Sequence, residues 1–286
     1  MPLPLYIVGG SMGIVEKTMR LNNGVIIPGI GMGTWQIPEE EAEKAVSQAI
    51  GQGYRLIDTA AIYKNEKSVG EGIKKSGIDR EEIFVATKLW NEDIRQETAE
   101  EGFLSSLDKL GLAYVDLYLI HWPVPGKYIE AWKTMVKLYE EKKVRAIGVC
   151  NCKVHHLKEL AERSGMMPMV NQIELHPLLS QKEVVDFCHK NGIVVQAYSP
   201  LMHGREQMQD TVFVNIAKKH ECTPAQVILR WHLQNGICVI PKSVNAARQR
   251  ENLSLTHFEL DEDDMKKIDA FNQNQRFCAD PDDFDF

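Results

Sequence analysis

The chain has 286 residues, of which 26% are charged, and a formal net charge of −7 without any basic stripe. This charge pattern excludes a nucleic-acid-binding footprint, and no apolar run approaches the length of a membrane-spanning helix, so we expect neither partner. Six cysteines without paired spacing indicate reduced thiols in a cytoplasmic protein, and they predict neither a disulfide framework nor a metal site.

The N-terminal part of the chain contains a short leader-like segment and then a hairpin pattern. Residues 1–13 include a second methionine, Met12, after Gly-Gly-Ser. We interpret 1–13 as a leader or an added segment without fixed structure, and 14–286 as one domain, since α/β barrels of about 250 residues commonly form a single domain. In Lys17–Pro28, apolar and polar residues alternate around Asn22-Asn23-Gly24, which is typical of a β-hairpin turn.

After the hairpin, short apolar runs alternate with amphipathic segments. The predicted strands are Gly29–Thr34, Tyr54–Asp58, Ile83–Lys88, Val115–His121, Arg145–Cys150, Met169–Gln172, Ile193–Tyr198 and Ile237–Ile240. The predicted helices are Glu39–Gln52, Glu66–Lys75, Gln96–Leu110, Lys127–Glu141, Val154–Arg163, Gln181–His189, Thr211–Lys219, Pro224–Gln234, Asn245–Asn252 and Asp261–Phe271. Strands that are apolar on both faces and alternate with helices predict an α/β fold, a (β/α)8 TIM barrel whose bottom is capped by the hairpin.

The alternative is an open, doubly wound sheet, which commonly carries a Gly-x-Gly-x-x-Gly motif at the start of a helix. The chain has Gly29-x-Gly31-x-Gly33 instead, and this spacing is typical of a crowded strand end that needs small residues. The pattern therefore favours the closed barrel.

Polar residues stand at or just after the ends of seven predicted strands: Asp58, Lys88, His121, Asn151, Gln172, Tyr198 and Lys242. A parallel barrel places all these strand ends on one rim, where enzymes of this fold have their active sites. We therefore interpret the chain as an enzyme.

Tyr63 follows Asp58 in the same loop and is a candidate general acid. A phenol has an ordinary pKa near ~10, so it donates a proton readily only where a cation favours its ionised form. Lys88 would supply that cation, Asp58 would hold the ammonium group, and His121 would hydrogen-bond a carbonyl oxygen. Each residue alone also has a structural interpretation, as a loop cap, a solvated strand end or a barrel histidine, and their common rim favours catalysis.

Four segments carry a resemblance to a known family. They are Gly53–Glu66 (GYRLIDTAAIYKNE), Leu119–Pro123 (LIHWP), Asn171–Pro177 (NQIELHP) and Ile240–Arg248 (IPKSVNAAR). The chain resembles the aldo-keto reductases from about Lys17 to its end, and in loop length it is similar to microbial and protozoan members such as 2,5-diketogluconate reductase and prostaglandin F synthase.

The resemblance implies NADPH-dependent reduction of a small aldehyde or ketone to an alcohol. Tyr63 would be the proton donor, and Asp58, Lys88 and His121 would complete the tetrad. Relatives are mostly monomers. Reduction of a prostaglandin endoperoxide on the same site, or a non-catalytic NADPH-binding barrel, are the alternatives.

Residues near the last strands could hold this cofactor. Tyr198 offers a ring face for the nicotinamide, and Asn151 and Gln172 could bind its carboxamide. Ser199 and Leu201 begin the loop after the seventh strand, where barrels often bind phosphate groups.

The start of the helix after the eighth strand favours a second phosphate. Lys242, Ser243 and Arg248 lie there, where backbone amides and an arginine suit an anion such as the 2′-phosphate of NADPH. By the resemblance, Glu251 and Asn252 contact the adenine. The full set of expected cofactor contacts also includes Thr34, Asp58, Cys150 and Val244.

Two further expectations concern Cys150 and the substrate pocket. Family members usually carry serine at the position of Cys150, whose thiol is a weaker donor, so we expect slightly weaker cofactor binding in preference to redox sensitivity. Trp35, Trp90 and Trp122 follow strand ends and, together with His121, suit an apolar substrate pocket. Whether the tail 280–286 folds over this pocket is left open.

Overall fold

The structure, a computed structural model, describes residues 18–286, so the expected leader at 1–13 lies outside the described residues. The described part begins with the antiparallel hairpin of β1 (Thr18–Arg20) and β2 (Ile26–Pro28). Side-chain hydrogen bonds attach its turn to the barrel, and two of them go to backbone oxygens: Asn22 Nδ2 donates to Pro168 O (3.2 Å) and Asn23 Nδ2 to Arg145 O (3.0 Å). Both acceptors lie where strands begin, so the hairpin caps the bottom of the barrel, as predicted.

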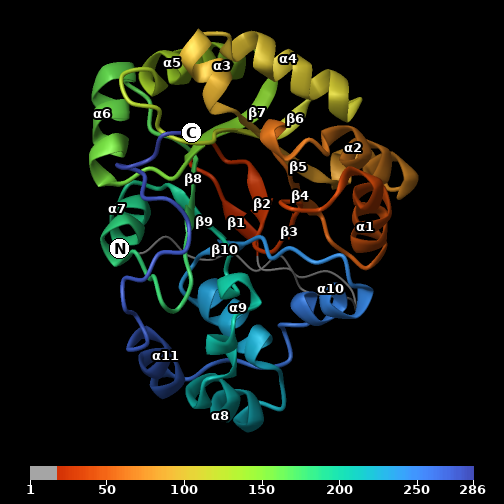
Figure 1. The fold of residues 1–286 in the computed structure, drawn as a ribbon, viewed down its shortest axis with the longest axis vertical. Helices are drawn as coiled ribbons and strands as arrows, with labels where there is room; N and C mark the ends of the chain where they lie inside the picture. Colours follow the sequence, from red (N-terminus) through yellow and green to blue (C-terminus); the bar gives the residue numbers. More distant parts are fainter. Residues whose placement is uncertain (1–17) are drawn as a thin grey trace.

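Eight parallel strands follow one another around the barrel in chain order (Figure 1). They are β3 (Met32–Gly33), β4 (Leu56–Asp58), β5 (Phe84–Leu89), β6 (Val115–Ile120), β7 (Val144–Cys150), β8 (Val170–Glu174), β9 (Val194–Tyr198) and β10 (Cys238–Val239). Parallel bridges between Ile30 and Val239 and between Gly33 and Lys242 join the two ends of the sheet. The predicted closed barrel is therefore confirmed.

The expected crowding at the first strand is visible at this seam. A Cβ atom on Gly33 would lie 2.7 Å from Ile240 O, and one on Gly31 would lie 2.4 Å from Leu56 Cγ. Both distances are shorter than real Cβ contacts allow, so the glycines let β3 approach its two neighbours and close the ring.

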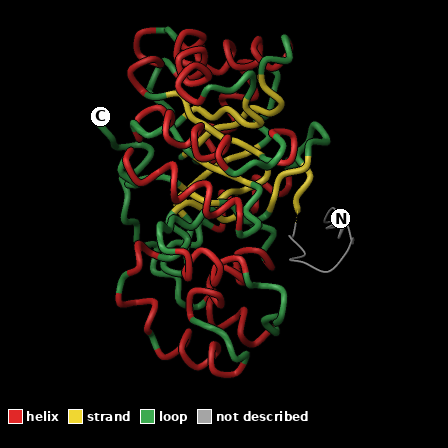
Figure 2. The backbone as a smooth tube through the Cα atoms, turned by 90° about the vertical axis from the view of Figure 1, so that its right-hand side faces the viewer, coloured by secondary structure: helices red, strands yellow, loops and turns green. Residues whose placement is uncertain are grey.

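Helices surround the strands on the outside of the barrel (Figure 1). They are α1 (Glu39–Gly51), α2 (Glu66–Lys75), α3 (Asn91–Gln96), α4 (Ala99–Leu110), α5 (Tyr128–Glu140), α6 (Val154–Ser164), α7 (Lys182–Lys190), α8 (Thr211–Lys219), α9 (Pro224–Gln234), α10 (Ala246–Leu253) and α11 (Glu262–Asp269). Helices α8, α9 and α11 gather at one end of the molecule, the lower end in Figures 1 and 2. No helix among residues 18–286 is long and apolar enough to cross a bilayer.

One predicted helix differs from the structure. The expected helix Gln96–Leu110 begins three residues later, and Gln96 is instead the last residue of α3, because Glu97 has a left-handed backbone (φ 60°) that ends α3. Thr98 N then donates to Asp93 O (2.9 Å), and α4 begins at Ala99. Asn91–Gln96 is therefore a separate helix that the apolar pattern did not indicate.

Candidate active site

The strand ends converge on one cavity of about 1000 Å³ at the top of the barrel. Six of the seven predicted rim residues line it: Asp58, His121, Asn151, Gln172, Tyr198 and Lys242. The seventh, Lys88, lies fully buried beneath Tyr63, which also lines the cavity. The structure thus brings the predicted catalytic set together.

Local structure holds the Tyr63 loop in place. Ala61–Tyr63 forms a 3-10 turn that ends at Lys64 in a left-handed conformation. The buried Asn65 side chain fastens this turn to the first loop, because its Nδ2 donates to Thr34 O and Ile37 O, both at 3.0 Å. Its Oδ1 accepts from Thr59 Oγ1 at 2.9 Å. Because both side-chain polar atoms of Asn65 are hydrogen-bonded, the turn holds the phenol of Tyr63 at a defined position beside the cavity.

Lys88 lies between the candidate acid Tyr63 and the carboxylate of Asp58. Its Nζ donates to Asp58 Oδ1 (2.5 Å), to Thr59 O (2.8 Å) and to Tyr63 OH (3.3 Å). Burial works to lower the pKa of Lys88, but its neighbours, with Asp58 first among them, together outweigh burial and raise the pKa above its ordinary value. The ammonium group therefore stays charged beside the phenol.

The rings of Tyr63 and His121 pack edge to face in the cavity lining, with centroids 5.7 Å apart. Burial raises the pKa of Tyr63 to about 12, although the charge of Lys88 opposes this rise. Burial and then the charge of Lys88 hold the pKa of His121 well below its usual range. At neutral pH the site therefore contains a protonated phenol and a neutral imidazole.

A polar corner lies on the other side of the cavity. Asn151 Nδ2 donates to His121 O (3.0 Å), and Asn151 Oδ1 accepts from Tyr198 OH (2.7 Å). Gln172 Nε2 donates both to Asp58 Oδ2 (2.8 Å) and to Gln196 Oε1 (2.6 Å). The corner keeps one donor hydrogen on Asn151 Nδ2 and one acceptor oxygen on Gln172 for a ligand, which matches the two polar groups of a primary carboxamide.

Basic side chains line the far end of the cavity near α10. Lys242 and Arg248 are exposed there, together with the more buried Ser243. The backbone amides of Ala247 and Arg248, which the sequence suggested for an anion, are instead occupied by the Asn245 side chain at 2.9 and 3.1 Å. An anion at this end therefore depends mainly on side chains.

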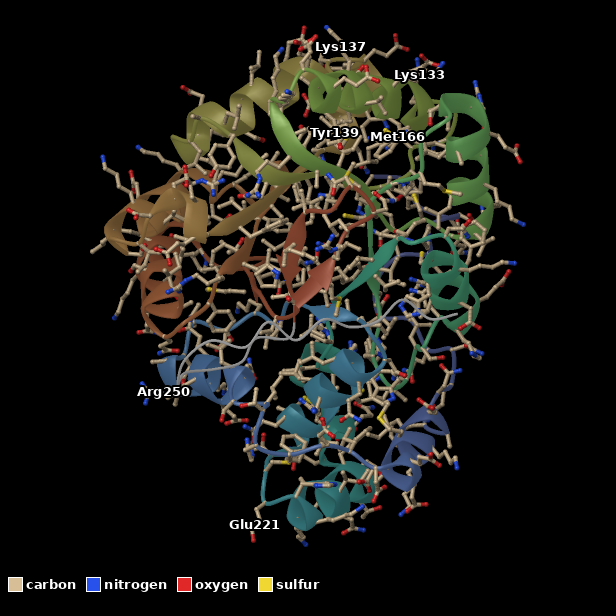
Figure 3. All side chains as sticks on the ribbon, turned by 180° about the vertical axis from the view of Figure 1, so that it is seen from behind. Lys133, Lys137, Tyr139, Met166, Glu221 and Arg250 are labelled. Atoms are coloured by element: carbon tan, nitrogen blue, oxygen red, sulfur yellow. The ribbon has the colours of Figure 1, made fainter. Side chains whose placement is uncertain are left out.

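Residues at the start of α9 and further along α10 complete the lining of this end. Thr223 Oγ1 donates to Glu251 Oε1 (2.8 Å), and Pro224 and Ala225 line the cavity beside them. Arg250, also on α10, is exposed and projects to the outside of the molecule (Figure 3). Sequence reasoning missed the α9 residues, since nothing in their helical pattern indicated that the helix start reaches the rim.

The structure sets two expected cofactor contacts back from the cavity wall. Thr34 is fully buried, and its Oγ1 donates to Asp58 O (3.0 Å), so it supports the Asp58 loop. Cys150 is only 1% exposed, and burial raises the pKa of its thiol above the ordinary range. This protected, protonated thiol agrees with the preference against redox sensitivity. The remaining expected contacts all line the cavity, including Ser199, Leu201, Val244, Glu251 and Asn252.

An aromatic wall forms the end of the cavity nearest to Tyr63. Trp35, Trp90 and Trp122 line it as predicted, and Trp90 lies against His121 with ring centroids 5.2 Å apart. The open question about the tail has an answer here, because Phe286 stacks on Trp90 at 6.1 Å and contacts Trp122 at 5.1 Å. The sequence signal that could have predicted this contact is the presence of aromatic residues within the acidic tail.

Ionic and hydrogen-bonded contacts hold this tail along the rim. Glu174 accepts from the backbone N–H groups of Phe277 (2.7 Å) and Cys278 (3.1 Å). Further along, Lys153 Nζ pairs with Asp280 (2.5 Å) and Asp282 (2.7 Å). The tail therefore crosses the ends of several strands before it reaches the aromatic wall.

The loop after β9 also lines the cavity, and sequence reasoning identified only its first residues. His203, Arg205 and Met208 add to the wall, and the His203 ring lies 5.8 Å from that of Trp35. Ser199 and His203 have positive φ angles (50° and 56°), a backbone conformation that non-glycine residues seldom adopt.

Comparison with known proteins gives consistent matches over nearly the whole chain. The model of the "Aldo/keto reductase family" matches residues 29–273. Glyoxal reductase of Bacillus subtilis (strain 168) is 50% identical over 273 residues, which cover 95% of this chain and 99% of that protein. The 9,11-endoperoxide prostaglandin H2 reductase of Trypanosoma cruzi (strain CL Brener) is 49% identical over 269 residues, covering 93% and 95%. A solved structure of a Gox0644 mutant in complex with NADPH has a TM-score of 0.90 at 42% identity, covering 95% of this chain and 99% of that one.

Proposed function

Because this chain belongs to the aldo/keto reductase family, we propose that it reduces small aldehydes and ketones to alcohols with NADPH, using Tyr63 as the general acid. The observation that carries the proposal is the contact series from Asp58 through Lys88 to Tyr63, at 2.5 and 3.3 Å, beneath a cavity lined by His121.

The described residues fit NADPH along the whole cavity. The nicotinamide carboxamide has one donor and one acceptor group, and the free Asn151 hydrogen and Gln172 oxygen complement them. Tyr198 supplies a ring face, and Lys242 and Arg248 supply positive charge for the 2′-phosphate. NADPH, when bound there, supplies the hydride that reduces the carbonyl carbon.

Tyr63 gives its proton to the carbonyl oxygen as negative charge develops there. Its pKa of about 12 keeps the phenol protonated at neutral pH, so Tyr63 carries the proton that it donates. The phenolate that remains is stabilised by the Lys88 ammonium group at 3.3 Å. Asp58 holds that ammonium group charged and oriented, which lowers the energy of the transition state for proton transfer.

His121 orients the carbonyl group. Its imidazole is neutral because its pKa is well below the usual range, so one ring nitrogen carries a hydrogen that can be donated to the carbonyl oxygen. Its ring lies against Tyr63 and Trp90, which restrict how it can rotate. Neutral His121 therefore positions the substrate, and the proton comes from Tyr63.

Small α-dicarbonyl compounds are the preferred substrate class. A relative with 50% identity is named glyoxal reductase, and the aromatic wall with Phe286 narrows the substrate end of the cavity. Reduction of a prostaglandin endoperoxide is the second candidate, since a relative with 49% identity carries that name. The complete catalytic set weighs against a barrel that only binds NADPH.

We further propose that residues 14–286 form one monomeric domain in the cytoplasm. One hydrophobic cluster extends from Met19 to Ile268, and all six cysteines are free thiols. Size-exclusion chromatography with light scattering tests the oligomeric state, and a mass near twice 32.5 kDa would refute the monomer.

The test of function follows NADPH oxidation with glyoxal, methylglyoxal, larger aldehydes and a prostaglandin endoperoxide. Tyr63→Phe should lower kcat by roughly 10²- to 10⁴-fold, the usual contribution of a general acid, and leave the NADPH dissociation constant within about threefold. Tyr139→Phe is the matched control, because Tyr139 lies near the hairpin at the bottom of the barrel (Figure 3). Full activity of Tyr63→Phe, or no turnover by the wild type despite tight NADPH binding, would refute the proposal.

A further inference from the structure

A buried glutamine lies directly behind the polar corner of the cavity. Gln196, in β9, is fully buried and does not line the cavity. Its Oε1 nevertheless lies 2.6 Å from Gln172 Nε2, the side chain expected to meet the carboxamide of the cofactor. A polar residue in a barrel interior needs partners for each of its polar atoms, so its contacts define what it does.

The contacts of Gln172 fix which of its atoms faces a ligand. Both hydrogens of its Nε2 are used, one by Asp58 Oδ2 at 2.8 Å and the other by Gln196 Oε1 at 2.6 Å. If the amide turned over, its oxygen would face two acceptor oxygens and lose both hydrogen bonds. Gln172 Oε1 is thus left as the acceptor on the cavity side. Asp58 alone would hold only one hydrogen and would leave the amide free to turn about that bond.

Gln196 is also hydrogen-bonded on the side toward the bottom of the barrel. Gln196 Nε2 donates to Cys238 Sγ (3.4 Å), and the Cys238 thiol donates to Pro28 O (3.3 Å). The direction of the series is set by Asp58, because its carboxylate oxygen can only accept and Gln172 must therefore turn its NH₂ group toward both Asp58 Oδ2 and Gln196. A Gln196 amide turned the other way would place its own NH₂ group against that of Gln172.

We propose that Gln196 is a positioning residue that fixes the amide of Gln172, so that Gln172 Oε1 accepts a hydrogen bond from the carboxamide NH₂ group of NADPH. The proposal rests on the proposed function, since it requires NADPH to bind with its nicotinamide in this corner. Gln196 acts only through Gln172, and its effect should appear in cofactor recognition more than in the proton-transfer step.

The test compares two cofactors that differ at one group. In the reduced 3-acetylpyridine analogue of NADPH, a methyl group replaces the carboxamide NH₂. Wild-type protein should bind NADPH about tenfold more tightly than this analogue, the loss expected for a buried acceptor left unpaired. Dissociation constants are measured from the quenching of tryptophan fluorescence, without any turnover.

Four variants separate positioning from general damage. Gln196→Met and Gln196→Leu remove the acceptor, and the preference for NADPH should fall to about twofold or less because Gln172 is no longer held. Gln196→Glu keeps an acceptor oxygen and should retain most of the preference. Val195→Ala, a neighbouring residue that is equally buried but outside the polar series, should keep the tenfold preference even if its melting temperature falls.

Each result has a defined meaning. An unchanged tenfold preference in both Gln196→Met and Gln196→Leu, or an equal loss in Val195→Ala, would overturn the positioning role and leave the proposed function intact. Wild-type protein that binds both cofactors equally would overturn it as well. Wild-type protein that fails to bind NADPH would instead refute the proposed function on which the role rests.

Discussion

Replacing one partner of the ion pair between Lys88 and Asp58 should strongly lower the free energy of unfolding, whereas replacing both partners by neutral residues should leave it nearly unchanged. Both side chains are almost completely buried, at 0% and 2% exposed, with their atoms 2.5 Å apart. Lys88→Met leaves the Asp58 carboxylate buried with Gln172 as its remaining side-chain donor. Replacing both charged groups by neutral ones leaves no uncompensated charge.

The size of the effect follows from this burial. Removing one partner of a buried pair typically costs about 3–5 kcal/mol. For a domain of this size, 1 kcal/mol changes Tm by roughly 2 °C, so Lys88→Met should lower Tm by about 6–10 °C. The double variant Asp58→Asn with Lys88→Met should recover to within about 1 kcal/mol of the wild type, since neutral replacements of buried pairs are often tolerated.

Thermal unfolding and NADPH oxidation are measured on the wild type, both single variants and the double variant. Stability should return in the double variant, whereas turnover should stay at least ~100-fold low, because the cation that stabilises the Tyr63 phenolate is still missing. A double variant whose loss equals the sum of the two single losses would refute the reasoning. A Lys88→Met variant that keeps its turnover would refute the catalytic role of the ammonium group.

Two further predictions concern the cofactor and pH. Arg248→Glu should raise the dissociation constant for NADPH by about 10- to 100-fold and change that for NADH little, because the charge reversal acts on the 2′-phosphate. Arg250→Glu, on the outward side of the same helix (Figure 3), is the control. Equal effects of Arg248→Glu on both cofactors would refute the assignment of Arg248 to the 2′-phosphate. The kcat for carbonyl reduction should be flat from pH about 6 to about 9, since the lowered pKa of His121 keeps the imidazole neutral and the pKa of Tyr63, raised to about 12, keeps the phenol protonated. A titration near pH ~6.5 that disappears in His121→Gln would contradict this interpretation.

The parts of the site that sequence could predict are those set by strand geometry. A residue at the end of a buried parallel strand must reach the rim, so Asp58, His121 and Gln172 could be placed from periodicity alone. Which way a side chain turns at that rim depends on its neighbours. Thr34 and Cys150 turn into the protein, a difference that the strand pattern does not encode.

The remaining features depend on contacts between distant segments. The tail is held over the site by Glu174, which lies about 100 residues before it in the chain and accepts from Phe277 and Cys278. The break between α3 and α4 depends on the left-handed backbone of Glu97, and a glutamate gives no strong sequence signal for this conformation. An anion site was predicted from the backbone amides at the start of α10, but the Asn245 side chain already accepts from the amides of Ala247 and Arg248.

The seam of the barrel has a consequence for how this chain acquires activity during synthesis. The bridges Ile30–Val239 and Gly33–Lys242 join segments about 200 residues apart, so they can form only after the last strand has been synthesised. The whole proton-donating set, from Asp58 to His121, leaves the ribosome well before Lys242 and Arg248. A nascent chain therefore carries its acid long before it can complete the ring or hold a cofactor, so a ribosome-bound chain arrested before Lys242 should be devoid of turnover.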